Sequence, residues 1–226
     1  MNTIKMMNII IMLLSTNLIF ACNMKENDCN LQQFIGPKPG YKSIFKGNIF
    51  PLELKGLSKD NNGIFEVEEI MDLTKLNLPK NIPSIITDKY QIYIDNDALI
   101  KKFKNREEIV LKKPCIPNSN NWEIIGKTGN IEIPSHDNIV FNDFALSCKI
   151  LRVGEESILG KEKLIIETRC VAKNRDSNIV RYEKYADGIG LVERSIKTLS
   201  NNKETEIYTF NIKEIEKTGE KTVVSP

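Results

Sequence analysis

The second half of the chain is a series of short strand-like segments separated by turn residues. Within these segments apolar and polar side chains alternate, which is typical of strands that bury one face. The segments are Trp122–Ile124, Ile131–Ile133, Phe144–Val153, Leu164–Ala172, Ile179–Tyr185, Leu191–Thr198 and Glu206–Ile212. Seven of them within about 90 residues leave room only for short connections, so the pattern predicts an antiparallel meander.

The first half has the same character with more loop residues. Its strand-like segments are 41–50, 51–57, 64–73, 90–94, 98–103 and 109–112. Asn62-Gly63 suits a hairpin turn, and Asp95-Asn96-Asp97 is a second turn sequence. No long helical periodicity competes with the strand pattern. We therefore expect a mainly β protein, an antiparallel curved sheet or half-barrel, with at most one or two short helices.

The first 21 residues have the features of an export signal. Lys5 gives a positive start, and Ile9–Leu14 is an apolar core. A membrane-spanning helix needs about 20 unbroken apolar residues. This stretch is shorter and is interrupted by Asn8 and Asn17, so we predict a cleaved signal peptide rather than a spanning helix.

The end of this signal, Ile19-Phe20-Ala21-Cys22, resembles the lipobox of bacterial lipoproteins. The resemblance implies that Cys22 carries diacylglycerol and palmitate chains and becomes the new N-terminus, anchored in the membrane. It divides the chain into a signal peptide (1–21), the lipidated cysteine with a tether (22–40) and a single mainly-β domain (41–226). The alternative is an ordinary secretory signal that ends by chance on a cysteine.

The same resemblance implies a location in the bacterial envelope. Asn23 stands where an aspartate would retain a lipoprotein in the inner membrane. We therefore expect the outer membrane if the cell has two membranes, and otherwise the outer face of the cell membrane.

The charge balance excludes one class of partner. The chain has 32 basic and 30 acidic side chains, mixed along the predicted strands, and a formal net charge of +2. Nucleic-acid-binding domains concentrate positive charge on one face. No nucleic-acid partner is expected.

Four cysteines remain besides Cys22, namely Cys29, Cys115, Cys148 and Cys170. An even number in an exported chain permits two disulfides, with three connectivities. No CxxC pair points to a redox motif or a structural zinc site. Four reduced, buried cysteines are the alternative.

Spacing favours one of the three connectivities. Cys148 and Cys170 lie on the apolar faces of two predicted strands whose midpoint falls at Leu159-Gly160. Because Gly160 suits a turn, a hairpin would place these two cysteines opposite each other. Cys29 would then join Cys115. In the chain-entropy model the shorter loop contributes about 3 kcal/mol and the longer loop somewhat over ~4 kcal/mol.

A family resemblance covers roughly residues 90–212. Val110–Pro114, followed by Asn121-Trp122-Glu123, and the segment Tyr185-Ala186-Asp187-Gly188-Ile189-Gly190-Leu191-Val192 are similar to two stretches of a large group of uncharacterised bacterial lipoproteins. Proteins of this group are similar in turn to the curved sheets of lipoprotein-localisation (Lol-like) carriers. The resemblance implies such a curved sheet and brings no catalytic residues.

The two glycines of this segment are expected to be structural. Gly188 and Gly190 allow a tight turn and a close crossing of two strands. A phosphate-binding loop is not indicated, because no GxGxxG or GxxxxGK motif occurs and no helix follows.

Candidate catalytic and metal-binding residues are few. His136 is the only histidine and lies in a predicted loop without a GxSxG motif. Asp95-Asn96-Asp97 and Asp60-Asn61-Asn62-Gly63 lack the glutamate that ends a calcium-binding loop. The adjacent pairs Glu68-Glu69 and Glu155-Glu156 would point to opposite faces of a strand. No metal, cofactor or catalytic residue is therefore predicted.

These observations predict a non-catalytic envelope lipoprotein that binds the membrane through Cys22. Its curved sheet would bind either an apolar ligand or a protein partner. The alternative is an envelope hydrolase. An open apolar cavity would favour the ligand, and a filled core would favour the protein partner.

Overall fold

The computed structural model describes residues 29–76, 83–104, 106–118, 121–126, 144–173, 178–200 and 203–218. Twelve strands in these residues form one antiparallel sheet. They are β1 (Tyr41–Gly47), β2 (Leu52–Lys59), β3 (Phe65–Asp72), β4 (Ile85–Asp95), β5 (Ala98–Lys102), β6 (Glu107–Lys112), β7 (Asn121–Gly126), β8 (Phe144–Ile158), β9 (Lys161–Lys173), β10 (Asn178–Ala186), β11 (Gly190–Ser200) and β12 (Lys203–Lys217). The strand order is β6-β5-β4-β3-β2-β1-β12-β11-β10-β9-β8-β7.

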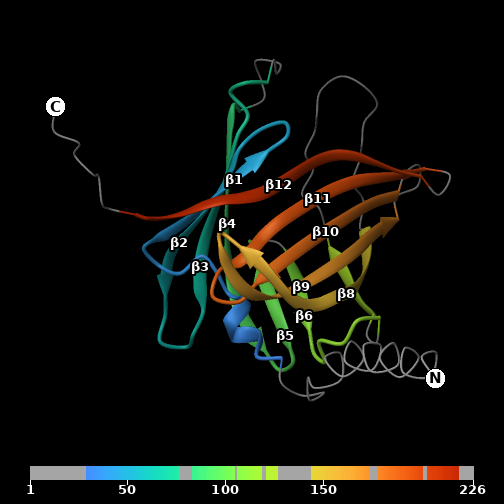
Figure 1. Cartoon of the computed structure of the whole chain (residues 1–226), viewed down its shortest axis with the longest axis horizontal. Helices are drawn as coiled ribbons and strands as arrows, with labels where there is room; N and C mark the ends of the chain where they lie inside the picture. Colours follow the sequence, from blue (N-terminus) through green and yellow to red (C-terminus); the bar gives the residue numbers. More distant parts are fainter. Residues whose placement is uncertain are drawn as a thin grey trace, which may run out of the picture.

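The sheet curls into a nearly closed barrel (Figure 1). Its two outer strands, β6 and β7, approach each other, and the Trp122 Nε1–H donates a hydrogen bond to the Ile109 carbonyl oxygen at 3.0 Å. The predicted mainly-β fold and antiparallel meander are confirmed. In the described part of the chain the one helical element is the 3₁₀ turn η1 (Leu31–Phe34).

The predicted turns occur where the sequence places them. Leu159 and Gly160 both have positive φ angles, 52° and 75°, and connect β8 to β9. Asn96 (φ 51°) connects β4 to β5, and Gly63 (φ 82°) lies between β2 and β3. Several strands run longer than their apolar alternation indicates. The predicted strand Ile131–Ile133 lies outside the described residues.

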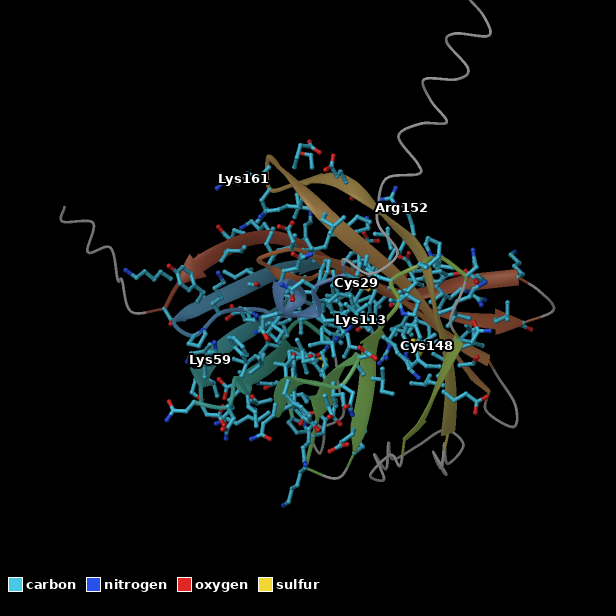
Figure 2. All side chains as sticks on the ribbon, turned by 90° about the horizontal axis from the view of Figure 1, so that it is seen from below. Cys29, Lys59, Lys113, Cys148, Arg152 and Lys161 are labelled. Atoms are coloured by element: carbon cyan, nitrogen blue, oxygen red, sulfur yellow. A yellow bond between two sulfur atoms is a disulfide. The ribbon has the colours of Figure 1, made fainter. Side chains whose placement is uncertain are left out.

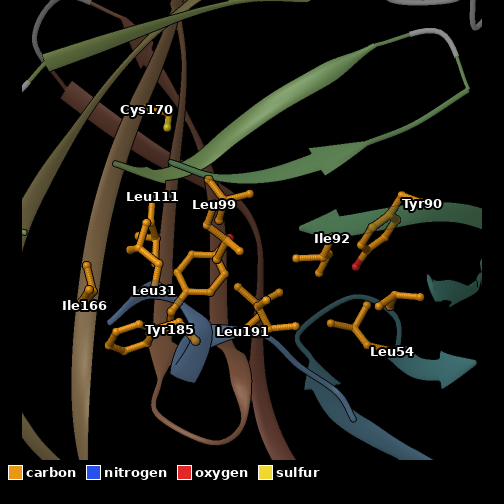
Figure 3. Packing of buried hydrophobic residues seen from close by; sticks show 14 of the residues in the cluster. Leu31, Leu54, Tyr90, Ile92, Leu99, Leu111, Ile166, Cys170, Tyr185 and Leu191 are labelled. Carbon is orange, nitrogen blue, oxygen red and sulfur yellow. The ribbon is translucent and has the colours of Figure 1, made fainter. Parts of the chain in front are cut away.

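The main core fills the inside of the barrel. Its members alternate along the strands with outward-facing side chains, as the period of two requires. Fully buried examples are Phe45 on β1, Leu54 on β2, Val67 on β3, Ile150 on β8 and Ile166 on β9. Figure 3 shows part of this core seen from close by.

The η1 turn closes one end of the barrel. Leu31 and Phe34 are each only 1% exposed and belong to the main core, and Leu31 lies beside Leu111 and Tyr185 (Figure 3). The amide of Gly188 donates to the Gln33 carbonyl oxygen at 2.7 Å, which ties η1 to the β10–β11 turn. The stretch expected to be a tether over 22–40 therefore contributes its second part to the folded core.

We call this end, with η1 and the turns at 60–63, 96–97 and 187–189, the plugged end. The opposite end, with the β1–β2 connection at 48–51, is the far end. In Figure 1 the plugged end lies low and the β1–β2 connection lies high. Because consecutive strands are antiparallel, the connections alternate between the two ends.

A second, smaller core lies apart from the main one. It contains Ile158 and Ile165 from the β8–β9 hairpin and Ala186, Ile189 and Val192 from the β10–β11 hairpin. Val192 and Leu191 are neighbours in the chain and belong to different cores. The two clusters therefore lie on opposite faces of β11.

Candidate functional site

The inside of the barrel holds a cluster of charged side chains, which we call the interior ionic cluster. Its members come from five strands, and the four that are counted as buried residues are 3–8% exposed. They are Glu69 on β3, Lys101 on β5, Glu108 on β6, Arg181 and Glu183 on β10, and Arg194 on β11. Glu69, Lys101, Glu108 and Glu183 each have a main-core residue two positions away on the same strand. Arg181 lies two positions from Glu183, and Arg194 is directly opposite Glu183 in the β10–β11 ladder.

Two ion pairs of this cluster cross the barrel. Arg194 Nη1 lies 2.8 Å from Glu69 Oε1, and Arg181 Nη1 lies 3.1 Å from Glu108 Oε2. Neither β11 and β3 nor β10 and β6 are neighbours in the sheet. These pairs therefore join the β1–β6 half of the sheet to the β7–β12 half through the interior.

Glu183 is the centre of the cluster. Its carboxylate accepts hydrogen bonds from Arg194 Nε at 2.9 Å and from the Tyr185 hydroxyl at 2.8 Å. Arg181 Nε lies 3.7 Å away, within ion-pair range but too far for a hydrogen bond. Burial by itself would raise the pKa of Glu183. The positive charges of Arg181, Arg194 and Lys101 outweigh it and hold the pKa well below its usual range.

Glu108 is held ionised in the same way. Burial opposes the charge on this carboxylate, but Arg181, Arg106 and Lys101 together lower its pKa. Arg106 Nε donates to Glu108 Oε1 at 3.0 Å and stacks its guanidinium 3.9 Å from the centre of the Phe103 ring. Because Arg106 is partly exposed, this pair reaches the edge of the barrel.

Lys101 and Tyr90 border a small cavity beside the cluster. The Lys101 ammonium lies 5.2 Å from the centre of the Tyr90 ring, and burial lowers its pKa. The Tyr90 hydroxyl is buried and has no hydrogen-bond partner among the described protein atoms. Phe34 and Leu54 also line the cavity, whose volume is about 10 Å³. That is room for about one water molecule.

The cluster has the properties of a structural network rather than of a catalytic site. Its carboxylates are paired with guanidinium groups, and none of its members is a serine, cysteine or histidine nucleophile or base. The described residues contain no group of three or more histidine, cysteine or acidic side chains placed to hold a metal ion. His136 lies outside the described residues.

The structure joins the cysteines in the pairs that the spacing favours. Cys148 and Cys170 are directly opposite each other on β8 and β9 and form a disulfide inside the barrel. Cys29 forms a disulfide with Cys115, which lies in the connection that follows β6. This second bond fixes the start of the described chain to the plugged end. Cys22 lies outside the described residues.

Gly188 and Gly190 both have positive φ angles, 72° and 91°, as a tight turn requires. The close crossing at Gly190, however, is not between two strands. A Cβ built at Gly190 would lie 2.8 Å from the Cα of Gly36, which follows η1. The glycine segment therefore makes room for residues 31–36, which comprise η1 and the two residues after it and which we call the N-terminal plug. That contact could not be read from the strand pattern.

Sequence reasoning also missed the interior ionic cluster. The mixture of basic and acidic side chains along the predicted strands does not by itself show which of them are buried. A signal was present, because Arg181, Glu183 and Tyr185 share one face of β10 with a spacing of two. Polar residues on a buried face of a strand indicate partners across the interior, although the pattern does not say which.

Removing the Cys148–Cys170 bond is expected to lower the free energy of unfolding by about 3 kcal/mol, because it closes a loop of 22 residues. The measurement is denaturant unfolding of the domain with both cysteines replaced by alanine, compared with the oxidised wild type. Wild-type protein reduced with dithiothreitol loses the Cys29–Cys115 bond as well and should be less stable than this variant. A loss below about 1 kcal/mol would contradict the prediction.

Comparison with known proteins finds similar structures but no similar sequence. No family model matches the chain, and no curated protein matches its sequence. A solved structure described as a "putative lipoprotein" from Parabacteroides distasonis matches with a TM-score of 0.50 and 10% identity, over 81% of this chain and 98% of that one. A "putative exported protein with YmcC-like fold" from Bacteroides fragilis matches with a TM-score of 0.42 and 10% identity, over 81% and 99%.

At this identity the first match shows a shared fold and nothing finer. The resemblance to Lol-like carriers stays a prediction. Within the described residues no helix is long and apolar enough to cross a membrane.

Proposed function

We propose that this chain is a lipid-anchored envelope lipoprotein whose barrel is a non-catalytic module for binding a protein partner. The anchor is Cys22, and the diacylglycerol and palmitate chains on it provide the membrane attachment. The lipobox sequence and the description of the Parabacteroides distasonis protein as a putative lipoprotein support the location.

The observation that favours a protein partner over an apolar ligand is that side chains fill the barrel interior in the described part of the chain. Carriers of a small apolar ligand enclose a pocket of about 300–1,000 Å³. Here η1 and the main core leave a cavity of about 10 Å³ beside Tyr90 and Lys101. The interior ionic cluster would also oppose an apolar ligand. Its ion pairs would have to break to make room for the ligand, and the charges would then be buried without partners.

A hydrolase would need a nucleophile or base with a hydrogen-bonded partner in an accessible cleft. The buried carboxylates of the interior ionic cluster, Glu69, Glu108 and Glu183, are instead each paired with a guanidinium group. This arrangement supports a binding module.

We expect the Cys22→Ser variant to be exported and released into the soluble fraction while its domain stays folded. The reason is that the acyl chains supply the attachment, at about 0.8 kcal/mol for each buried methylene. The measurement is fractionation followed by thermal melting of the released protein, with Cys29 and Cys115 left intact.

Native mass spectrometry of this released protein tests the binding mode. The expected mass is that of the polypeptide alone. If a stoichiometric lipid stays bound after gentle desolvation, the protein is a lipid carrier and not a module for binding a protein partner. Retention of the Cys22→Ser variant in washed membranes would refute the lipid anchor.

A further inference from the structure

We infer that the plugged end of the barrel faces the lipid bilayer and that the far end faces away from it. This inference rests on the proposed lipid anchor at Cys22. It adds the surface that meets the membrane and the direction in which the rest of the barrel points.

The first step is the point at which the anchor meets the fold. Cys29 is bonded to Cys115, and two residues later Leu31 is buried in the main core. The amide of Lys113 donates to the Asp97 carbonyl oxygen at 2.8 Å, so the β4–β5 turn lies beside this disulfide. Figure 2, which views the molecule from below relative to Figure 1, shows Cys29 and Lys113 close together near the middle. The chain therefore leaves the fold at the plugged end.

The second step is the length of the link. Six residues separate Cys22 from Cys29. A fully extended chain advances at most 3.3–3.6 Å per residue, so Cys22 lies within about 25 Å of Cys29. Strands of eleven residues such as β4 extend over about 35 Å, although their tilt shortens the barrel. Seating the far end on the same bilayer would therefore require the link to run fully extended along the barrel, whereas the plugged end reaches the bilayer without such extension.

The third step concerns charge. The plugged end carries both signs, with Lys59 and Lys113 (Figure 2) near Asp60 and Asp97. Such a surface is not a polybasic site for anionic lipids. The anchor, rather than electrostatic attraction, therefore sets the orientation.

The orientation has a consequence for the barrel. The end nearest the bilayer is the one that Leu31 and Phe34 close. A lipid could not pass straight from the membrane into the interior at this end. The loops of the far end, including the β1–β2 connection at 48–51, are the ones presented to other envelope components.

The test is energy transfer from a single introduced tryptophan to dansyl-labelled lipid headgroups in vesicles that carry the full acylated protein. Asp97→Trp places the donor in an exposed turn at the plugged end. Ile49→Trp, at a residue 41% exposed, is the matched donor at the far end. Trp122 is present in both variants, and its contribution is measured in the wild type and subtracted.

We expect transfer from Asp97→Trp to be roughly twice that from Ile49→Trp or more, because the length of the strands separates the two turns. Equal transfer, or more from Ile49→Trp, would overturn the orientation while the acylated protein still floats with the vesicles. If the acylated wild type does not float, both the proposed anchor and the orientation are wrong. If the Cys22→Ser protein binds anionic vesicles by itself, a charged surface sets the orientation, and the inference is again wrong.

Discussion

Replacing Glu183 with glutamine is expected to lower the free energy of unfolding by about 3–5 kcal/mol, because it removes a carboxylate that compensates the charge of two buried guanidinium groups. Arg194 would keep its pair with Glu69, and Arg181 its pair with Glu108. Both guanidinium groups nevertheless lie in the interior, and the negative charge of Glu183 offsets part of the cost of burying their positive charges. The measurement is urea unfolding of the domain.

The matched control is Glu53→Gln on β2. Glu53 is 40% exposed and lies 3.8 Å from Lys42, so its ion pair is a surface pair. Such pairs contribute about 0–1 kcal/mol. Equal effects of the Glu53 and Glu183 substitutions would show that the interior ionic cluster does not stabilise the barrel.

The same substitution should alter the acid sensitivity of the fold. The pKa of Glu183 is lower in the folded chain than in the unfolded chain, so the folded state binds fewer protons. Its contribution is complete above the unfolded pKa of about 4.3 and is lost as the pH falls through the folded value. Glu108 acts in the same direction. Stability of the wild type should therefore decline below about pH 4.3, and the decline should be shallower in Glu183→Gln.

Replacing Gly36 with alanine is expected to destabilise the fold by more than about 4 kcal/mol or to prevent folding. A Cβ at this position would overlap the carbonyl oxygen of Ile189. Both partners are backbone, so no flexible side chain can move away. The N-terminal plug would have to shift, and with it Leu31 and Phe34 would leave the core. The measurement is thermal and denaturant unfolding of the domain.

Gly154→Ala is the matched control, because no atom lies within 4 Å of the Cβ that it adds on β8. It should change stability by less than about 0.5 kcal/mol. Gly190→Ala should resemble Gly36→Ala, since it adds a Cβ 2.8 Å from Gly36 and places it on a backbone with φ 91°. If Gly36→Ala and Gly154→Ala have the same free energy of unfolding, the close approach of Gly36 to Ile189 is not required for stability.

The strand pattern was readable from the sequence because a half-buried strand imposes a period of two on its own residues. The Leu159-Gly160 turn followed from the same local rule, and its position then aligned Cys148 with Cys170. Turn chemistry and alternation are properties of neighbouring residues. They can therefore be recognised without knowledge of the rest of the fold.

The contacts that close the barrel were not readable in this way. The partner of Arg194 is Glu69, 125 residues earlier, and the partner of Gly190 is Gly36. No local pattern specifies such a pair, because each depends on how far the sheet curls. The burial of Leu31 and Phe34 was missed for the same reason, since a four-residue turn next to a polar stretch shows no periodicity.

By itself, then, the sequence predicts an export signal and a lipid anchor, and it determined the antiparallel strands and the hairpin that aligns two cysteines. All of these depend on residues close together in the chain. Only the tertiary structure decided that the interior is filled, that opposite charges such as Glu108 and Arg181 cross it, and that an N-terminal plug closes one end. Those features depend on the curvature of a twelve-stranded sheet, which brings distant residues to the same dry interior and leaves them stable only when paired.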